Sequence, residues 1–166
     1  DLLSDAVYGL SEHYADAIMS ARLVACPGCY PTAVLTALLP VIKLGQVSCD
    51  DLIIDAKSGV TGAGRSLKET NLFSEIAEGL APYGIAHHHH VPEIEQEIGF
   101  AAGSDNVTIN FTPHLVPMNR GELVTIYAKT NGAKADDVRA SLNAFYDDKP
   151  FVRIVGEEET PATRHV

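Results

Sequence analysis

Cys29 lies in the stretch of this sequence with the most potential for chemistry, residues 24–33, where a short apolar run meets a long apolar helix pattern. The pattern predicts that Cys29 stands at the start of that helix. A helix start presents unpaired N–H groups and a partial positive charge, and both favour a thiolate, the nucleophilic form of cysteine. We therefore interpret Cys29 as a candidate nucleophile, with a buried structural cysteine as the alternative.

Four consecutive histidines occupy residues 87–90. Histidine exchanges protons near neutral pH, and a cysteine nucleophile often works with a histidine that is distant in sequence. Three alternatives stay open at this point. The histidines could form a solvated loop without a role, they could bind zinc together with Cys26 and Cys29, or the C-x-x-C spacing of these cysteines could serve redox chemistry.

Two further segments could contact a substrate or a cofactor. Residues 58–65 form a glycine-rich loop whose backbone N–H groups could cradle an anion or a cofactor amide, although it is neither a P-loop nor a G-x-G-x-x-G motif. Turn geometry alone could also explain these glycines. Arg120 lies between two predicted strands and could hold a carboxylate or phosphate through two hydrogen bonds, with a simple surface arginine as the alternative.

The elements that must position these residues alternate along the chain. Hydrophobic periodicity predicts helices at 11–21, 29–45, 92–101 and 135–146, with a weaker one at 67–79, and Pro40 is expected to kink or end the second. Strands are predicted at 22–25, where the strand should be buried, and at 51–56, 106–112, 122–129 and 151–155. This order favours an α+β fold, a mixed and largely antiparallel sheet covered by helices.

Composition narrows the functional classes. The chain has 166 residues and a formal net charge of −10, with no basic stripe, so nucleic acid is an unlikely partner. No apolar run approaches the roughly 20 residues that span a bilayer, and the first residues do not form a signal peptide. Three cysteines, without a secretory context, fit a reducing compartment, and we expect a cytoplasmic protein.

Together these segments resemble the N-acetyl-gamma-glutamyl-phosphate reductases, within the wider group of aspartate-semialdehyde and glyceraldehyde-phosphate dehydrogenases. The matching strings follow the order of that family and cover nearly the whole chain: residues 7–10 (VYGL), 27–33 (PGCYPTA), 58–65 (SGVTGAGR), His90 with 92–96 (PEIEQ), and 113–118 (PHLVPM) with Arg120 and Gly121. The resemblance implies that residues 1–166 form the catalytic and dimerisation domain of a homo-oligomer. The NADP-binding Rossmann domain is expected to be absent from this chain, which alone should not turn over with NADPH.

The resemblance also implies a reaction and roles for residues. Cys29 would attack a small-molecule acyl phosphate and form a thioester, which NADPH would reduce to N-acetylglutamate semialdehyde in arginine biosynthesis. His90, or else His88, would activate Cys29 and move the proton. The implied cofactor contacts at the active-site mouth are Ser58, Gly59, Gly62 and Gly64. The implied substrate contacts are His114, Arg120 and Arg65, and no metal is expected.

Two positions depart from the pattern of that family. Cys26 stands where the family often has asparagine, which could remove a polar contact or expose Cys29 to disulfide formation, although a tolerated small substitution is the simpler interpretation. His89 replaces an arginine. Other hypotheses remain: a reductase of the same group acting on aspartyl phosphate or a carrier-bound substrate, or a non-enzymatic metal or redox module.

Overall fold

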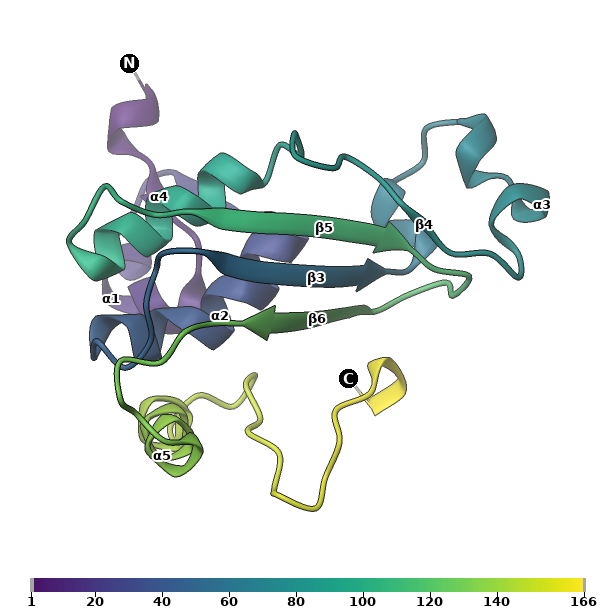
Figure 1. Ribbon diagram of the computed structural model, residues 1–166. Coiled ribbons are helices and arrows are strands. Elements are labelled where there is room, and N and C mark those ends of the chain that lie inside the picture. The colour runs from purple at the N-terminus through teal and green to yellow at the C-terminus, as the bar shows by residue number, and fades with distance from the viewer. Residues whose placement is uncertain (1, 166) are drawn as a thin grey trace.

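The computed structural model describes residues 2–165, so Asp1 and Val166, the ends of the predicted domain, lie outside the described residues. Its main sheet has the strand order β4-β5-β3-β6 (Figure 1). The central strand β3 (Leu52–Ser58) pairs in parallel with β5 (Ile109–Leu115) and antiparallel with β6 (Glu122–Tyr127), while the short β4 (Ala81–Pro82) pairs antiparallel with β5. The predicted α+β fold with a mixed sheet is confirmed.

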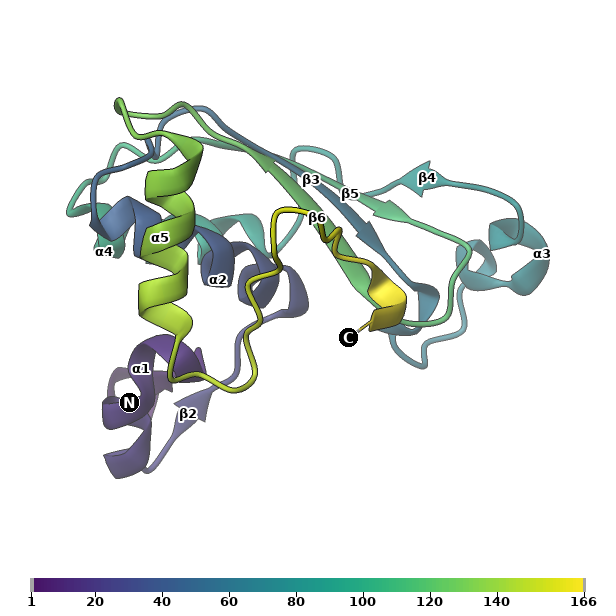
Figure 2. The ribbon, with the colours of Figure 1, turned by 90° about the horizontal axis from the view of Figure 1, so that it is seen from below.

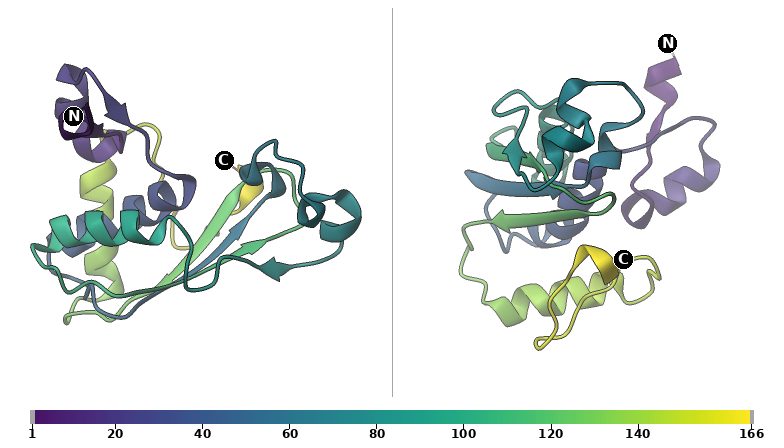
Figure 3. Two further views of the ribbon diagram at one scale, coloured as in Figure 1. Left: turned by 90° about the horizontal axis from the view of Figure 1, so that it is seen from above. Right: turned by 90° about the vertical axis from the view of Figure 1, so that its right-hand side faces the viewer.

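Helices cover one face of this sheet and leave the other bare. The helices α2 (Cys29–Lys43) and α4 (Val91–Ala102) lie side by side on the same face (Figures 2 and 3). Inward side chains of β3 alternate with outward ones, because successive strand residues point to opposite faces. The core between these layers consists mainly of fully shielded aliphatic side chains: Leu35, Leu39, Leu52, Ile54, Ile94 and Ile98.

The remaining elements flank this two-layer core. A two-stranded parallel sheet joins β1 (Val7–Tyr8) to β2 (Val24–Ala25), with α1 (Ser11–Ser20) between them. The amphipathic helix α5 (Ala135–Tyr146) packs against α2. Short helical turns complete the described chain: η1 (Leu2–Asp5), η2 (Val60–Ala63), η3 (Glu69–Asn71), α3 (Phe73–Ile76) and η4 (Thr163–His165). None of the described helices is long and apolar enough to cross a bilayer.

Three predicted elements differ from the structure. The strand β2 is exposed rather than buried, because it pairs only with β1 at the margin of the molecule. Residues 67–79 form short turns instead of one helix, since Leu67 and Phe73 are almost fully exposed and no packed face stabilises a longer helix. Residues 151–155 form no strand, and the carbonyl of Val155 accepts a hydrogen bond from Arg139 of α5 instead of from a neighbouring strand.

The helix α2 continues past Pro40 to Lys43, where the sequence predicts a kink or an end. Proline removes the N–H that would bond to the carbonyl four residues earlier, which here belongs to Thr36. The hydroxyl of Tyr146 in α5 donates a hydrogen bond to this same Thr36 carbonyl, at 2.5 Å. A side chain from a neighbouring helix therefore satisfies the acceptor that Pro40 leaves unpaired.

We expect Tyr146→Phe to lower the free energy of unfolding by about 1–3 kcal/mol, because the Thr36 carbonyl loses its donor and the ring nitrogen of His13 loses its hydrogen-bond partner. Phe151→Leu, which changes a side chain that is 91% exposed, should stay within about 0.5 kcal/mol of the parent. Urea denaturation measures both. In a Pro40→Ala background, which restores the backbone donor, the cost of Tyr146→Phe should shrink, and an unchanged cost would contradict this explanation of how α2 tolerates Pro40.

Candidate functional site

Cys29 is the first residue of α2, so its predicted place at a helix start is confirmed. Gly28 precedes it as the N-cap with an extended backbone. The carbonyl of Gly28 accepts hydrogen bonds from both the N–H and the hydroxyl of Thr32, at 3.0 and 2.8 Å. These bonds fix the first turn, while the side chain of Cys29 remains exposed.

The first turn of α4 contacts the backbone directly before this cysteine. Glu93 accepts hydrogen bonds at one carboxylate oxygen from the N–H of Gly28, at 3.1 Å, and from the hydroxyl of Tyr8, at 2.7 Å. The ring of His90 lies so close to Gly28 that a Cβ added there would be 2.3 Å from its Nε2 atom. Only glycine fits at position 28, and its contacts tie Cys29 to α4.

His90 caps α4 and is held neutral at neutral pH. Its Nδ1 is buried and has no hydrogen-bond partner within residues 2–165. Burial lowers the pKa of His90 below its ordinary value, as does the neighbouring His89, while Glu93 acts in the opposite direction. A neutral imidazole beside Gly28 can accept a proton and, once charged, return it.

His88 is buried among aromatic side chains. Its ring packs edge-on against Tyr30, Tyr83 and Phe111, with centroids 5.3 to 5.6 Å away, and its Nδ1 accepts the N–H of His90 at 3.2 Å. Burial, followed by the neighbouring histidines, lowers the pKa of His88 to about 4. His88 thus packs among these aromatic rings, while the ring of His90 lies against Gly28, the residue before Cys29.

The resting thiol differs from the thiolate that the helix start predicts. Although Cys29 is exposed as a residue, partial burial of its thiol and then the negative charge of Glu122 raise its pKa to about 11. The backbone N–H groups of Tyr30 and Cys29 act in the opposite direction, as a helix start should, but they do not outweigh the first two causes. Cys29 is thus a neutral thiol at neutral pH. The sequence pattern revealed the helix start, but it did not reveal the carboxylate of Glu122, whose charge opposes the thiolate.

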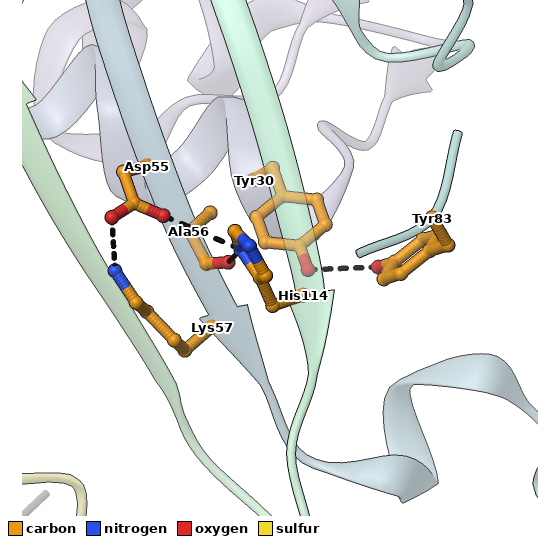
Figure 4. Close-up of polar contacts among 6 residues, drawn as sticks. All are labelled: Tyr30, Asp55, Ala56, Lys57, Tyr83 and His114. Carbon is orange, nitrogen blue, oxygen red and sulfur yellow. Dashed lines mark hydrogen bonds and ion pairs between the residues drawn. The ribbon is translucent and has the colours of Figure 1, made fainter. Parts of the chain in front are cut away.

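A cavity of about 900 Å³ opens beside Cys29 and is lined by all four histidines. Tyr30 forms part of its wall, and its hydroxyl shares a 2.7 Å hydrogen bond with that of Tyr83, from the segment after β4 (Figure 4). Lys68 lies at the same cavity and contributes a positive charge. The cavity thus brings a thiol, imidazole rings and a lysine together.

Only part of the glycine-rich loop reaches this cavity. Ser58 and Gly62 line it. Gly59 instead packs against the backbone of Asn119 and Arg120, where an added Cβ would lie 2.9 Å away. Gly64 and Arg65 line a neighbouring cavity of about 530 Å³. The loop therefore offers Ser58 and Gly62 to a ligand at Cys29, while Gly59 serves close packing.

The structure does not bring His114 or Arg120 into the cavity beside Cys29. His114 lies on the bare face of the sheet, where its Nδ1 is 3.3 Å from a carboxylate oxygen of Asp55 and 3.2 Å from the carbonyl oxygen of Ala56, and Lys57 pairs with the same aspartate (Figure 4). The sequence pattern placed His114 in a loop, but β5 extends through it, and strand alternation turns it away from α2. Arg120 is exposed.

Sequence reasoning missed Glu122, Lys68 and Tyr83. Glu122 begins β6 two residues after Arg120, on the same side of the strand as Val124 and Ile126. This alternation is visible in the sequence, and it predicts that the side chain of Glu122 points inward, toward α2. Lys68 and Tyr83 lie in irregular segments without such a signal. Within residues 2–165, no three His, Cys, Asp or Glu side chains are arranged to hold a metal ion.

Comparison with known proteins identifies a matching protein family and similar curated relatives. Residues 29–166 match the family described as semialdehyde dehydrogenase, dimerisation domain. The whole chain is also 51% identical to an N-acetyl-gamma-glutamyl-phosphate reductase of Rhodospirillum rubrum, of which it covers 47%. The chain spans about half the length of the curated relatives it matches.

Solved structures share the fold at low sequence identity. Aspartate semialdehyde dehydrogenase II from Vibrio cholerae superposes with a TM-score of 0.69 at 14% identity, over 96% of this chain and 54% of that one. An aspartate semialdehyde dehydrogenase with NADP from Candida albicans gives a TM-score of 0.54 at 16% identity, over 82% of this chain and 44% of that one. At such identities the likeness concerns the fold alone.

The depressed pKa of His88 predicts a pH-dependent stability. The unfolded chain, with an ordinary histidine pKa of about 6.5, binds more protons than the folded chain between pH 6.5 and 4. The free energy of unfolding should therefore fall as the pH drops through this window. His13, whose pKa burial also lowers to about 4, acts in the same direction. Urea denaturation of His88→Gln should show a shallower fall than the parent, and equal slopes would contradict the assignment.

Proposed function

This chain belongs to the semialdehyde dehydrogenase family through its dimerisation domain, and on that premise we propose that it takes part in reducing N-acetyl-gamma-glutamyl phosphate to N-acetylglutamate semialdehyde, in arginine biosynthesis. The reductase named among its relatives supports this choice of substrate. The observation that carries the proposal is the exposed Cys29 at the start of α2, beside a cavity with neutral histidines and Lys68.

In the proposed acylation, the sulfur of Cys29 attacks the acyl carbon of the substrate. The thiol proton passes to the neutral imidazole of His90 as the carbon–sulfur bond forms. The bond from the acyl carbon to the phosphate oxygen then breaks, and inorganic phosphate leaves with the bonding electrons. Lys68 can balance the charge of the phosphate from the cavity wall. The free N–H groups at the start of α2 favour the negative charge that develops at the reacting centre. The product of this step is a thioester on Cys29.

In this proposal the nicotinamide end of NADP would lie beside this thioester. Ser58 and Gly62 would hold it, because they line the same space as Cys29 and the glycine leaves its backbone uncovered. Bound NADPH supplies the hydride that reduces the thioester. His90, adjacent to Gly28, is assigned the proton exchange at the carbonyl oxygen of the acyl group. We also propose that most contacts to NADP come from a Rossmann domain outside residues 1–166.

We further propose that a second copy of the chain packs on the bare face of the sheet. The family description names a dimerisation domain, and in the described chain no helix covers this face (Figure 2). Its apolar side chains Ile53, Leu123 and Tyr127 are all at least 40% exposed. They flank the polar group of Asp55, Lys57 and His114, which would then pair within or across the interface.

The acylation half-reaction can be tested without a cofactor. We expect the protein, mixed with N-acetyl-gamma-glutamyl phosphate, to release about one equivalent of inorganic phosphate per chain in a rapid phase, because each Cys29 is acylated once. Cys29→Ser should abolish this phase. Cys49→Ser, which changes a cysteine outside the cavity, should leave it unchanged. A rapid phase that survives in Cys29→Ser would refute the proposal.

The oligomeric state tests the proposed interface. Leu123→Glu places a charge on the bare sheet face and should raise the dimer dissociation constant at least about tenfold, because an unpaired buried charge is costly. Sedimentation velocity over a range of concentrations measures this change. Phe151→Glu alters a side chain that is 91% exposed outside that face and should leave association unaffected. If both variants associate like the parent, the interface lies elsewhere.

A further inference from the structure

The hydroxyl of Tyr8 is connected to the start of α2 through a single carboxylate oxygen. It donates a hydrogen bond to Oε1 of Glu93, at 2.7 Å, and the N–H of Gly28 donates to the same oxygen, at 3.1 Å. Gly28 is the N-cap of α2 and directly precedes Cys29. We call these two hydrogen bonds the Glu93 tether. It joins β1, α4 and the start of α2, three segments that are distant in sequence.

The position of the Glu93 carboxylate depends on these two donors. No lysine or arginine of the described chain forms an ion pair with Glu93. Burial, followed by the hydrogen bond with Glu93, raises the pKa of Tyr8, so its hydroxyl keeps its proton and remains a donor. The ring of Tyr8 in turn contacts the ring of Tyr14 edge-on, with centroids 6.0 Å apart. Tyr8 is therefore a fixed donor that holds Glu93 in place.

His90 contacts the same glycine from the same helix. A Cβ added at Gly28 would lie 2.3 Å from its Nε2 atom, and His90 comes three residues before Glu93 in the chain. A shift of Glu93 would therefore move the N-cap of α2 relative to this ring. The titratable side chains around His90 are Tyr30 of α2, the neighbouring His88 and His89, and Glu93.

A second tyrosine and glutamate repeat the first pair one turn further along α4. The hydroxyl of Tyr14 in α1 donates a hydrogen bond to Oε2 of Glu97, at 2.6 Å, and Glu97 is buried. Glu93 and Glu97 are four residues apart and so lie on one face of the helix. The two bonds have the same chemistry, but in the described chain it is Glu93 that accepts the N–H of Gly28.

We propose that Tyr8 is a positioning residue for the acylation of Cys29: through Glu93 it holds Gly28 against the ring of His90. The effect on acylation rests on the proposed function, whereas the tether itself does not. Tyr8 does not line the cavity beside Cys29, so it acts through Glu93. Transfer of the thiol proton requires the two groups to come within hydrogen-bond reach, and the tether sets the placement of the helix start that carries the thiol.

The test compares Tyr8→Phe with Tyr14→Phe, because each variant removes one hydroxyl that donates to a glutamate of α4. Rapid phosphate release from N-acetyl-gamma-glutamyl phosphate should slow roughly tenfold in Tyr8→Phe, within the loss of about 10²-fold that a misplaced reacting group can cause. It should be unchanged in Tyr14→Phe. Urea denaturation should show that both variants lose stability, because each loses a hydrogen bond to a carboxylate.

Amide hydrogen exchange, followed by NMR, examines the tether without substrate. The N–H of Gly28 should exchange faster in Tyr8→Phe than in the parent, because Glu93 is held less firmly there. In Tyr14→Phe the exchange of Gly28 should equal that of the parent, although the stability is lowered. This readout separates a local effect on the start of α2 from a general loss of stability.

The variant Glu93→Gln separates position from charge. Its amide oxygen can accept both hydrogen bonds, so the tether stays. Burial lowers the pKa of His90 and the charge of Glu93 opposes this effect, so removing the charge should lower that pKa further. Phosphate release needs a neutral His90, and its decline on acidification should therefore move to lower pH in Glu93→Gln. In Tyr8→Phe, which keeps the charge, the decline should not move to lower pH.

Each outcome decides a part of the proposal. Unchanged exchange of Gly28 in Tyr8→Phe overturns the tether. Faster exchange with unchanged phosphate release overturns the role of Tyr8 in acylation, and so does an equal slowing in Tyr8→Phe and Tyr14→Phe. If the parent itself releases no phosphate, the proposed reductase function fails, while faster exchange of Gly28 in Tyr8→Phe alone still supports the tether.

Discussion

The close contact between the first turn of α4 and the backbone of Gly28 is the constraint on which the rest of this site depends. It exists because Gly28 has no Cβ, which lets the ring of His90 lie where a side chain would otherwise stand. Glu93 completes the contact by accepting the N–H of Gly28. Since α2 and α4 also share the core beneath the sheet, the position of Cys29 follows from the packing of two helices rather than from its own loop.

Electrostatics then decide the protonation state of Cys29. The start of α2 favours a thiolate, but burial and the carboxylate of Glu122 outweigh it, so the resting thiol is neutral. His88 and His90 are also held neutral by burial. At neutral pH the thiol of Cys29 and the imidazoles of His88 and His90 are therefore uncharged. This arrangement suits a substrate that brings its own negative charges into a cavity containing Lys68.

Much of this organisation could be predicted from the sequence, and the failures have physical causes. The helix at 135–146 and the helix start at Cys29 follow from apolar periodicity and are found as predicted. The sequence predicts a strand that ends at residue 112, before Pro113, whereas β5 continues to Leu115. The face on which His114 lies depends on this continuation, which the proline-containing segment does not indicate. Strand alternation predicts that Glu122 points inward, but its effect on the pKa of Cys29 depends on the folding together of segments that are distant in sequence, which local pattern does not record. The continuation of helix α2 past Pro40 likewise depends on a hydrogen-bond donor from α5, the hydroxyl of Tyr146.

The most direct test of the central claim is to locate the acyl group after the protein meets N-acetyl-gamma-glutamyl phosphate. Rapid acid quenching, digestion and mass spectrometry of the peptides would show which residue carries the added mass. The account predicts an acyl group on Cys29 alone, removable by hydroxylamine as a thioester should be. An acyl group on Cys26, on Lys68 or on a histidine of 87–90, with Cys29 unmodified, would contradict it.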